Sequence, residues 1–523
     1  MAVSKAKPLS FSTTIRNPYR IPNFLRCILP FEHQILTSDI IHSIVKTVIR
    51  EKEYKPNYIK YTTHLNEIYE DPDLTFNDEQ LELIIKMSPQ DHHEKGFDWG
   101  WDSRFDTWYK LIKEFGMIKY AMNEEIIVTE TGHMMVDASL EDPVNEKKIQ
   151  ELFLNALMKY QTNNPLRRNL NDNVPLPLLL SVIKMLHEDI EENGAGIYIK
   201  EIPILLCWRN NDAVSLYKYI KGIRKSNKFN YSDEFIYDRC LSILESDNRN
   251  YLKMDKICHE SVDEYIRKMR MSGVVSLRGQ GRFLDINSFE TETVDYIIKT
   301  YMKYPKFETE DEYIDYMGTI DRNILKLEST PVPDFTDIRK RTLYKFANEM
   351  TKEDVKKELE IVCTKNKYSK HDVLKFIKEP TRLEFLTSIA LVQNFKGLDV
   401  NPNYSVDDEG LPTNTASGGV ADIECFDSDY DSYFEVTLMC SRSDQVNNEI
   451  IPISRHLQEA KKNRRIESFS VFVAPIVHQD TYEAVEWQKM KYKVDILPYD
   501  ILGFIDAIDT HEKASQLLLE SMK

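Results

Sequence analysis

The sequence lacks several features that would assign it to a common class. Its seven cysteines are scattered over 523 residues without any Cys-x-x-Cys spacing, so we expect reduced thiols in a cytoplasmic protein rather than a disulfide framework. The longest apolar run, Val174–Ile183, is interrupted by two prolines and is too short to span a membrane. Low-complexity segments, long Gly/Ser linkers and a signal peptide are missing as well, so we expect a globular chain without a membrane partner.

Positive charge is also in short supply. The chain has 68 Lys and Arg against 85 Asp and Glu, a net charge of −17, which argues against indiscriminate binding to nucleic acid phosphates. Site-specific binding needs only one positive face, however, and three basic clusters are candidates, although each is also typical of a solvated helix face. They are Arg267-Lys268-Met-Arg270 with Arg278 and Arg282, the run Arg339-Lys340-Arg341, and Lys461-Lys462-Asn-Arg464-Arg465.

Length and composition predict an α+β multidomain protein. The chain has 42% hydrophobic, 11% aromatic and 29% charged residues, which is typical of folded domains, and its length suffices for two to four of them. We expect a mainly helical region over 1–300, a helical linker over 301–350 and an α/β domain over 351–523. Periodic apolar residues predict helices in the first region at Glu146–Tyr160, Leu176–Asp189 and Asn211–Lys225.

A weak internal repeat is present in the first region. Each copy reads as a helix, a glycine stop and two short strands around a polar tip, which is typical of a winged-helix unit but also of any small α+β subdomain ending in a hairpin. We expect winged-helix-like units near 98–135 and 255–290. The first has its helix at Trp101–Phe115 and strands at Met117–Ala121 and Ile126–Thr129; the second has its helix at Val262–Met271 and strands at Val274–Leu277 and Arg282–Ile286, around the tip Arg278-Gly-Gln280-Gly.

The last region alternates between helix and strand. Such an order favours a mixed central sheet with helices on its faces. Helices are expected at Lys352–Lys365 and Lys370–Ile377, and another begins at Pro380. Two hairpin strands and a helix follow, and then come a strand at Ser468–Pro475, a helix at Thr481–Met490, a strand at Val494–Pro498 and a final helix.

A hairpin with two carboxylates is the most informative feature of this region. The β-type runs Val420–Phe426 and Tyr433–Leu438 are joined by a polar turn over 427–432. Asp422 and Glu435 lie on these runs and can converge at one edge of the sheet. Paired carboxylates bind a hard divalent cation such as Mg²⁺, which can activate water and neutralise charge on a phosphodiester. An ordinary solvated hairpin is the alternative interpretation.

Three more residues could complete such a site. Glu384 stands among apolar residues at the start of a helix, where it can point inward. Glu449 and His456 are seven residues apart, but Pro452 disfavours a continuous helix between them. We therefore expect Glu449 in the approach to a helix and His456 in its first turns.

The predicted chemistry is metal-assisted hydrolysis. Asp422 and Glu435 would hold Mg²⁺, with the main-chain carbonyl of Val436 as a further ligand. Glu384 or Glu449 would supply a second carboxylate shell or bind a second ion. The candidates for the catalytic centre are therefore Asp422, Glu435, Glu384, Glu449 and His456.

One usual component of such a site is missing. Restriction-type nucleases place a lysine two residues after the glutamate, and this chain has Thr437 there. The missing positive charge has to come from His456, Arg455 or a metal. His456 is our choice, because the pKa of imidazole also suits it to orient or deprotonate water or to stabilise the leaving oxygen.

At these residues the chain resembles the AlwI family of type IIS restriction and nicking endonucleases. The resemblance includes Thr437 and the spacings of 38 residues from Glu384 to Asp422, 13 from Asp422 to Glu435 and 7 from Glu449 to His456. It covers nearly the whole chain. The motifs are Thr14-Ile-Arg16-Asn-Pro18-Tyr-Arg20-Ile-Pro22, Trp101-Asp-Ser-Arg104-Phe105, Glu130-Thr-Gly132, Pro165-Leu-Arg167-Arg168, Gly279-Gln-Gly-Arg282-Phe283, Leu383-Glu384-Phe-Leu, Ala421-Asp422-Ile-Glu424, Glu435-Val-Thr437 and Glu449…Arg455-His456.

The resemblance implies a recognition region followed by a restriction-endonuclease-like nuclease domain. It implies Mg²⁺-dependent cleavage of double-stranded DNA a few base pairs outside a short asymmetric site. Such enzymes cut both strands by pairing catalytic domains, in a transient homodimer or with a small subunit, and act beside a cognate DNA methyltransferase. A strand-specific nicking enzyme, the large subunit of a heterodimer and, in another class, a non-catalytic DNA-binding regulator remain alternatives.

The residues that read bases can be predicted only from general chemistry. Arginine pairs with guanine, and asparagine or glutamine pairs with adenine. We expect residues of these types at or just before helix starts and at the tip of the second hairpin. The candidates are Arg104, Arg209, Asn210, Arg278, Gln280 and Arg282.

Overall fold

A computed structural model describes most of the chain and divides it into two compact units. Unit 1 comprises 1–66 and 75–331, and unit 2 comprises 67–74 and 332–523. The assignment of 1–300, 301–350 and 351–523 to recognition, linker and nuclease stays a prediction. The described residues are 6–11, 15, 17–167, 171–192, 194, 196–246, 248–326, 335–365, 367–463 and 467–521; Thr14, Arg16, Arg168, Arg464 and Arg465, which carried sequence-based expectations, lie outside them.

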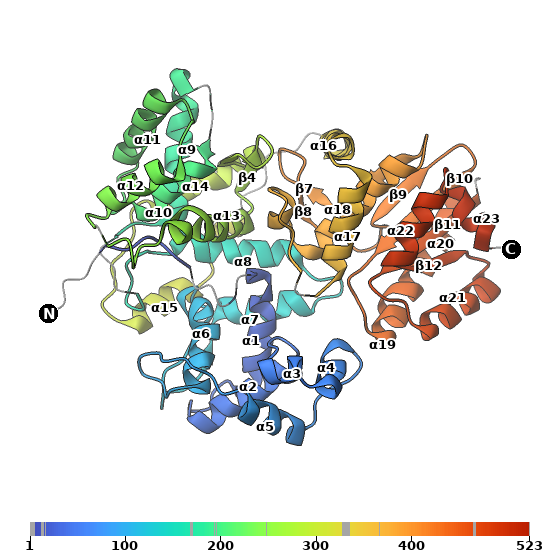
Figure 1. Cartoon of the computed structure of the whole chain (residues 1–523), viewed down its shortest axis with the longest axis horizontal. Helices are drawn as coiled ribbons and strands as arrows, with labels where there is room; N and C mark the ends of the chain where they lie inside the picture. Colours follow the sequence, from blue (N-terminus) through green and yellow to red (C-terminus); the bar gives the residue numbers. More distant parts are fainter. Residues whose placement is uncertain are drawn as a thin grey trace. The chain divides into compact units, whose positions relative to one another are not determined.

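Unit 1 is mostly helical, with two small antiparallel sheets (Figure 1). The three helices expected at 146–160, 176–189 and 211–225 are confirmed to within two residues. None of the helices in the described part of the chain is both long and apolar enough to cross a membrane. The helices of unit 1 are α1 Ile21–Ile28, α2 Ser38–Arg50, α3 Asn57–Lys60, α4 Thr63–Glu70 (shared with unit 2), α5 Asp78–Met87, α6 Trp101–Glu114, α7 Glu130–Leu140, α8 Glu146–Lys159, α9 Pro175–Glu188, α10 Ile202–Cys207, α11 Ala213–Asn227, α12 Asp233–Ile243, α13 Ser261–Met271, α14 Thr291–Tyr301 and α15 Glu310–Gly318.

Both expected helix–hairpin segments are formed. In the first, α6 is followed by the antiparallel pair β1 (Ile118–Lys119) and β2 (Ile127–Val128). In the second, α13 is followed by β4 (Val275–Arg278) and β5 (Phe283–Ile286). Gly116 and Gly273, which end the two helices, have φ angles of +72° and +75°, a left-handed conformation that glycine adopts without a Cβ penalty.

The second hairpin carries a strand that the sequence did not indicate. The two-residue strand β3 (Ile197–Tyr198) pairs with β5, which gives a three-stranded sheet in the order β3-β5-β4. The hairpin tip is formed by three successive residues with positive φ, Gly279, Gln280 and Gly281. Gln280 is therefore presented to solvent at the turn of the hairpin.

Unit 2 contains a mixed sheet, as expected, and its five strands have the order β12-β11-β10-β9-β6. Strands β10, β11 and β12 run parallel to one another, and β9 is antiparallel to both β10 and β6. A separate pair is formed by β7 (Ser405–Val406) and β8 (Pro412–Asn414). The five strands are β6 Asp399–Pro402, β9 Ile423–Phe426, β10 Tyr430–Val436, β11 Glu467–Ala474 and β12 Ile496–Asp500.

Helices cover both faces of this sheet (Figure 1). Side chains of β10 alternate between the faces: Phe434 meets Phe504 of α22 on one face, and Tyr433 joins Ile450, Ile453 and Leu457 in an apolar cluster on the other. Helices α18 and α22 therefore lie opposite α20. The helices of unit 2 are α16 Phe335–Glu349, α17 Lys352–Cys363, α18 Glu379–Asn394, α19 Arg442–Asp444, α20 Ile451–Asn463, α21 Gln479–Tyr492, α22 Ile501–Thr510 and α23 Ser515–Ser521.

Some details of unit 2 differ from the sequence-based expectation. The helix expected at 370–377 is wrong, since only a short 3₁₀ turn, Leu374–Phe376, forms there. Strand β6 was not expected. The hairpin turn is shorter than expected because Asp427 Oδ1 accepts hydrogen bonds from the backbone N–H groups of Asp429 and Tyr430, each at 2.7 Å. This local turn closes early, so residues 430–432 belong to β10.

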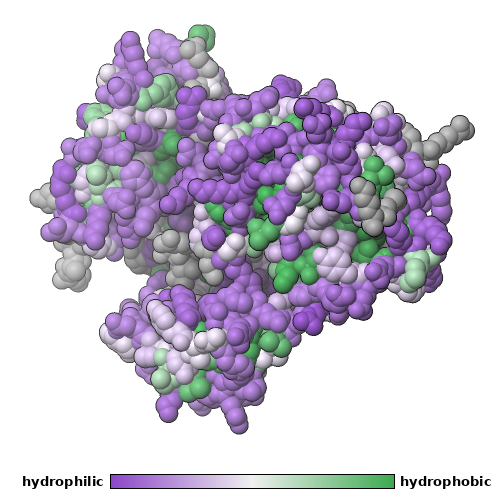
Figure 2. Space-filling view, turned by 45° about the vertical axis from the view of Figure 1, so that its right-hand side comes forward, coloured by the Kyte–Doolittle hydropathy of each residue, from purple (hydrophilic) through white to green (hydrophobic). Residues whose placement is uncertain are grey.

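The surface reflects the charged composition. In the face drawn in Figure 2, hydrophilic residues dominate and hydrophobic ones form small separate patches. Single exposed apolar side chains are normal for a folded protein. The architecture is therefore held together by the interiors of the two units.

Two helical glycines give a test of this packing. A Cβ at Gly132 of α7 would clash with the Met117 carbonyl oxygen and lie 2.7 Å from Val128 Cγ1, whereas one at Gly222 of α11 would meet nothing within 4 Å. We expect Gly132→Ala to destabilise unit 1 by about 1–3 kcal/mol and Gly222→Ala to stabilise it by up to about 1 kcal/mol. Urea unfolding checks both values, and shifts of the same sign would contradict the packing described.

Candidate active site

Asp422 and Glu435 lie side by side at one end of the β9–β10 hairpin. In the register of β9 and β10, Phe434 faces Ile423. One residue further along each chain segment, Glu435 therefore lies opposite Asp422, with both side chains on the same face. The backbone N–H of Asp422 lies 3.4 Å from Glu435 Oε2, and the backbone N–H of Val436 donates to Asp422 Oδ2 at 2.8 Å. Each carboxylate is thus oriented by the backbone next to the other.

A continuous helical segment brings Glu449 and His456 to this pair. The expected break at Pro452 is wrong: α19 runs through a π-helical stretch, Gln445–Ile450, directly into α20. A π turn replaces the i→i−4 hydrogen-bond pattern just before the proline, which has no N–H to donate, and so accommodates it. His456 Nδ1 then lies 3.6 Å from Glu435 Oε1, too far for a hydrogen bond.

Glu435 is buried, Asp422 and Glu449 are half-buried, and these carboxylates repel one another. Burial, the charge of Glu435 and that of Glu449 raise the pKa of Asp422 well above its ordinary value, against the N–H of Val436. Burial and the charge of Glu449 likewise raise the pKa of Glu435 to about 8. Such a cluster favours protonation or a bound cation.

The surroundings of His456 favour its neutral imidazole. Burial and the positive charge of Arg455 lower its pKa, although Glu459 and Asp422 act in the opposite direction. A neutral imidazole can hold or accept a proton but supplies no positive charge. Among the three expected sources of positive charge, this favours Arg455 and a metal over His456.

Two buried atoms at the centre of the cluster have no hydrogen-bond partner among the residues that the structure describes. They are Glu435 Oε1 and His456 Nδ1. An unsatisfied buried carboxylate oxygen is costly, and a hard divalent cation with its water ligands would satisfy it. The described residues contain no group of three or more His, Cys, Asp or Glu side chains that could hold a metal. A metal here would depend on two carboxylates together with main-chain, water or phosphate oxygens, which fits Mg²⁺.

Glu384 contacts the segment that leads into the site. It is buried on α18, 3% exposed, and its Oε2 accepts a hydrogen bond from the backbone N–H of Ala416 at 3.1 Å. Ala416 lies six residues before Asp422. Glu384 therefore fixes the approach to β9, whereas Asp422, Glu435, Glu449 and His456 form the cluster itself.

Thr437 and Asn403 hold the backbone around the pair. Thr437 Oγ1 accepts from the N–H of Met439 at 3.1 Å, which turns the chain away from β10. Asn403 donates from its backbone N–H to the Asp422 carbonyl at 2.8 Å and from Nδ2 to the Ala421 carbonyl at 2.7 Å. The sequence did not indicate Asn403, because its partners lie 18 and 19 residues away and form no local pattern.

Comparison with known proteins identifies the family. The model of the AlwI restriction endonuclease family matches residues 113–363 and 332–507, well over half of the chain. The chain belongs to the AlwI restriction endonuclease family. A comparison with curated proteins gives no match.

Similar solved structures of this AlwI family member include other restriction endonucleases. The small subunit of the heterodimeric enzyme R.BspD6I is 23% identical, with 32% of this chain and 85% of that chain covered and a TM-score of 0.26. FokI is 10% identical alone and 11% bound to DNA, with 96% of each chain covered and TM-scores of 0.25 and 0.23. These scores are too low to carry an argument about a shared fold.

The DNA-contact candidates in this AlwI family member make contacts within the protein. The Arg104 guanidinium lies 4.9 Å from the Tyr54 ring centre and 2.8 Å from His92 Nε2. Three others make ion pairs or turn contacts. Arg209 pairs with Glu245 at 2.6 Å, Asn210 Oδ1 accepts from Trp208 Nε1 and Asp212 N, and Arg278 pairs with Asp285 at 3.0 Å.

Gln280 and Arg282 lie at the tip of the second hairpin. Both side chains are exposed, and Arg282 Nε donates to the carbonyl of Gly279 at 2.9 Å. Two of the basic clusters are engaged internally: buried Lys268 pairs with Glu264, and Arg339 donates to the Pro402 carbonyl. The hairpin tip and Asn210 are thus exposed among the predicted contact sites.

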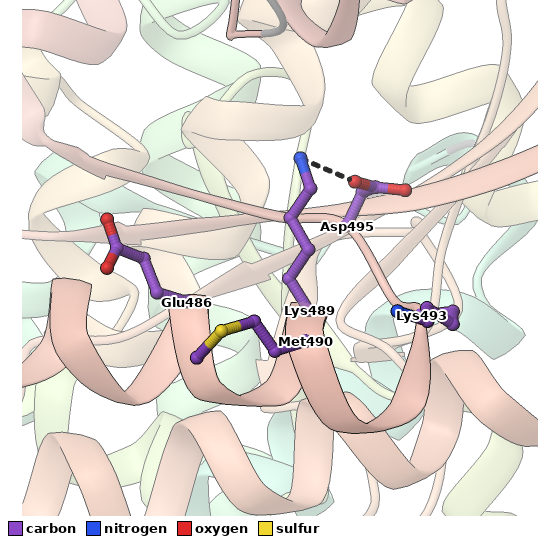
Figure 3. A pocket seen from close by; sticks show the side chains of 5 residues that line it. All are labelled: Glu486, Lys489, Met490, Lys493 and Asp495. Carbon is purple, nitrogen blue, oxygen red and sulfur yellow. Dashed lines mark ion pairs between the residues drawn. The ribbon is translucent and has the colours of Figure 1, made fainter.

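An open pocket of about 460 Å³ lies elsewhere in unit 2 (Figure 3). Lys489 on α21 forms an ion pair with Asp495 at 3.1 Å across it. Asp495 precedes the first residue of β12, whereas Glu435 is next to the last residue of the parallel strand β10. The pocket therefore lies toward the opposite end of the strands and is separate from the carboxylate cluster. Its lining is Glu486, Lys489, Met490, Lys493 and Asp495.

The raised pKa of Glu435 predicts a pH-dependent penalty in the metal-free protein. Between an ordinary pKa of 4.5 and about 8, the folded state keeps a proton that the unfolded chain releases, so the free energy of unfolding falls as pH rises. Glu435→Gln lacks this group. Without divalent metal, we expect it to match the wild type at pH 5 and to exceed its stability at pH 8 by on the order of 2 kcal/mol.

Urea unfolding in EDTA at the two pH values measures this difference. Adding Mg²⁺ at pH 8 should stabilise the wild type more than Glu435→Gln, since only the wild type has both carboxylates to offer. Parallel pH profiles of the two proteins would show that Glu435 is not the source of the penalty.

Proposed function

We propose that this AlwI family member is a type IIS endonuclease. It recognises a short asymmetric site in double-stranded DNA and hydrolyses phosphodiester bonds a few base pairs away with Mg²⁺. The observation that supports this most directly is the Asp422–Glu435 pair, partly shielded from water, in which Glu435 Oε1 has no hydrogen-bond partner among the described residues. Membership of the family supports nuclease activity, and the carboxylate pair is the proposed site of this activity in unit 2.

The roles of the side chains follow from their contacts. Asp422 and Glu435, with the carbonyl of Val436, would hold Mg²⁺, which when bound neutralises charge on the phosphodiester and lowers the pKa of water. The Val436 N–H keeps the Asp422 carboxylate turned toward Glu435. Glu449 adds a third negative charge near the pair.

His456 and Arg455 would handle protons and charge. Neutral His456, with Nδ1 3.6 Å from Glu435 Oε1, can accept a proton from an attacking water or orient it. Arg455 is exposed on the same helix, where it could contact a DNA phosphate in place of the missing lysine. Glu384 keeps the segment before Asp422 in position through Ala416.

DNA recognition is assigned to unit 1. Its two helix–hairpin segments, α6 with β1–β2 and α13 with β4–β5, would act as winged-helix units that differ in sequence. Two unlike units in one chain suit an asymmetric target, whereas a symmetric dimer would require a palindrome. The exposed Gln280 and Arg282 would contact DNA from the second hairpin.

The number of strands cut depends on a partner. The chain brings one Asp422–Glu435 pair, so cutting both strands would require a second catalytic domain, from a transient homodimer or a small subunit. Without it the enzyme would nick one strand, alone or as the large subunit of a heterodimer. A DNA methyltransferase of the same system would protect the host site.

Removing the central carboxylate tests the assignment. We expect Asp422→Ala to lower Mg²⁺-dependent plasmid cleavage about 1,000-fold or more, since loss of a metal ligand costs several kcal/mol of transition-state stabilisation. Binding to the recognition site, measured by gel shift, should persist. Asp429→Ala, on the exposed turn of the same hairpin, is the matched control and should cut at the wild-type rate.

Two outcomes would overturn this proposal. Cleavage by Asp422→Ala at the wild-type rate would remove the site. Sequence-selective binding without cleavage by the wild-type protein, even at high enzyme with Mg²⁺ or Mn²⁺, would indicate a DNA-binding regulator instead. Run-off sequencing of both strands would distinguish a nick from a double-strand cut.

The second hairpin gives an independent test of recognition. We expect Arg282→Ala to weaken DNA binding about tenfold and to reduce the slope of log affinity against log salt by about 1 if it contacts a phosphate, or to relax specificity at one base pair if it reads a base. Arg249→Ala removes an arginine that is 62% exposed elsewhere in unit 1 and serves as the control. Equal affinities for the two variants would remove the hairpin from the interface.

A further inference from the structure

Gln445 is a fully buried amide that ties together three segments of unit 2. It is 0% exposed and is the first residue of the π-helical stretch before α20. Its Nε2 donates to the Met439 carbonyl at 3.1 Å and to the Ile476 carbonyl at 2.7 Å. Its Oε1 accepts from Thr481 Oγ1 at 2.8 Å. Both amide hydrogens and the carbonyl oxygen are therefore used.

The three partners come from different parts of the fold. Met439 lies in the loop between β10 and α19, Ile476 lies in the loop after β11, and Thr481 lies in the first turn of α21. A buried network of this kind fixes one arrangement, because breaking any of its bonds leaves a polar group unsatisfied in the interior. Gln445 thus locks the two loops that follow neighbouring parallel strands.

The position of Gln445 along the chain relates it to the carboxylate cluster. Met439 comes four residues after Glu435, and Gln445 comes four residues before Glu449. The hydrogen bond between Gln445 and Met439 therefore bridges the middle of the segment that connects Glu435 to Glu449. Close by, His478 Nε2 and the Cys440 carbonyl lie 2.7 Å apart, a second bond that holds the same loop.

We propose that Gln445 is a positioning residue, which sets the spacing between Glu435 and Glu449 and so the affinity for the divalent cation. This inference rests on the proposed function of the cluster. Gln445 itself touches neither carboxylate in the contacts described. It acts by fixing the loop that leaves β10 and the π turn that carries Glu449.

A second buried glutamine in unit 2 offers a matched control. Gln488 on α21 is 5% exposed and accepts a hydrogen bond from Ser454 Oγ on α20 at 2.7 Å. It links α20 and α21 through Ser454 rather than through Met439 or Ile476. Gln445→Met and Gln488→Met remove the same chemical group and preserve similar volume.

The experiment compares cleavage by the two variants over a range of Mg²⁺ concentrations. For Gln445→Met we expect the half-saturating Mg²⁺ concentration to rise about tenfold, the lower end of the effect of losing a direct partner of a metal ligand, because Gln445 acts only through the loop and the π turn. The KM for DNA should stay within about twofold, because unit 1 is assigned to recognition. Gln488→Met should lower the unfolding temperature by a similar amount and leave the half-saturating Mg²⁺ concentration unchanged.

A milder variant covers the case in which Gln445→Met fails to fold. Thr481→Val removes only the hydroxyl that holds Gln445 Oε1, and it should raise the half-saturating Mg²⁺ concentration about threefold, a smaller loss than removal of the whole amide. Equal Mg²⁺ dependence of wild type, Thr481→Val and Gln445→Met would overturn the inference. Absence of Mg²⁺-dependent cleavage by the wild type would instead overturn the proposed function.

Discussion

The mutual repulsion of Asp422 and Glu435 is the constraint on which unit 2 depends. Two carboxylates of like charge, close to a third at Glu449, are partly shielded from water, which costs free energy unless a proton or a cation is present. The fold resists their separation because each is oriented by a backbone N–H of the opposite strand. Apolar packing of the surrounding sheet and helices offsets this cost.

The arrangement of the sheet explains how such strain is tolerated. Strand β10 is paired on both sides, parallel to β11 and antiparallel to β9, and it is covered by α18 and α22 on one face and by α20 on the other. Apolar residues such as Tyr433 and Phe434 anchor it just before Glu435. The charged group thus stands at the end of the strand, where loops, water and substrate oxygens can reach it.

The sequence predicted the parts of unit 2 that follow local patterns and missed those that depend on distant partners. Alternating apolar residues identified the hairpin, β11 and β12. The Asx turn at Asp427 shortened the hairpin turn, and the π turn before Pro452 carried the helix through a proline that normally ends one. Asn403 has partners 18 and 19 residues away, and no spacing in the sequence indicates such contacts. The sequence likewise did not indicate that Tyr54 lies beside Arg104 or that Asp285 pairs with Arg278, because the fold brings these residues together.

The acidic composition is compatible with site-specific DNA binding, which does not need a broad basic surface. Several Lys and Arg side chains already form ion pairs with Asp or Glu. Arg209 and Arg278 in unit 1 are matched to Glu245 and Asp285, so they add little to the long-range field that drives non-specific association. A protein with a net charge of −17 gains little affinity from phosphates in general. The proposed recognition therefore relies on a few exposed groups such as Gln280 and Arg282, and a small set of directional contacts discriminates between sequences better than a broad basic surface does.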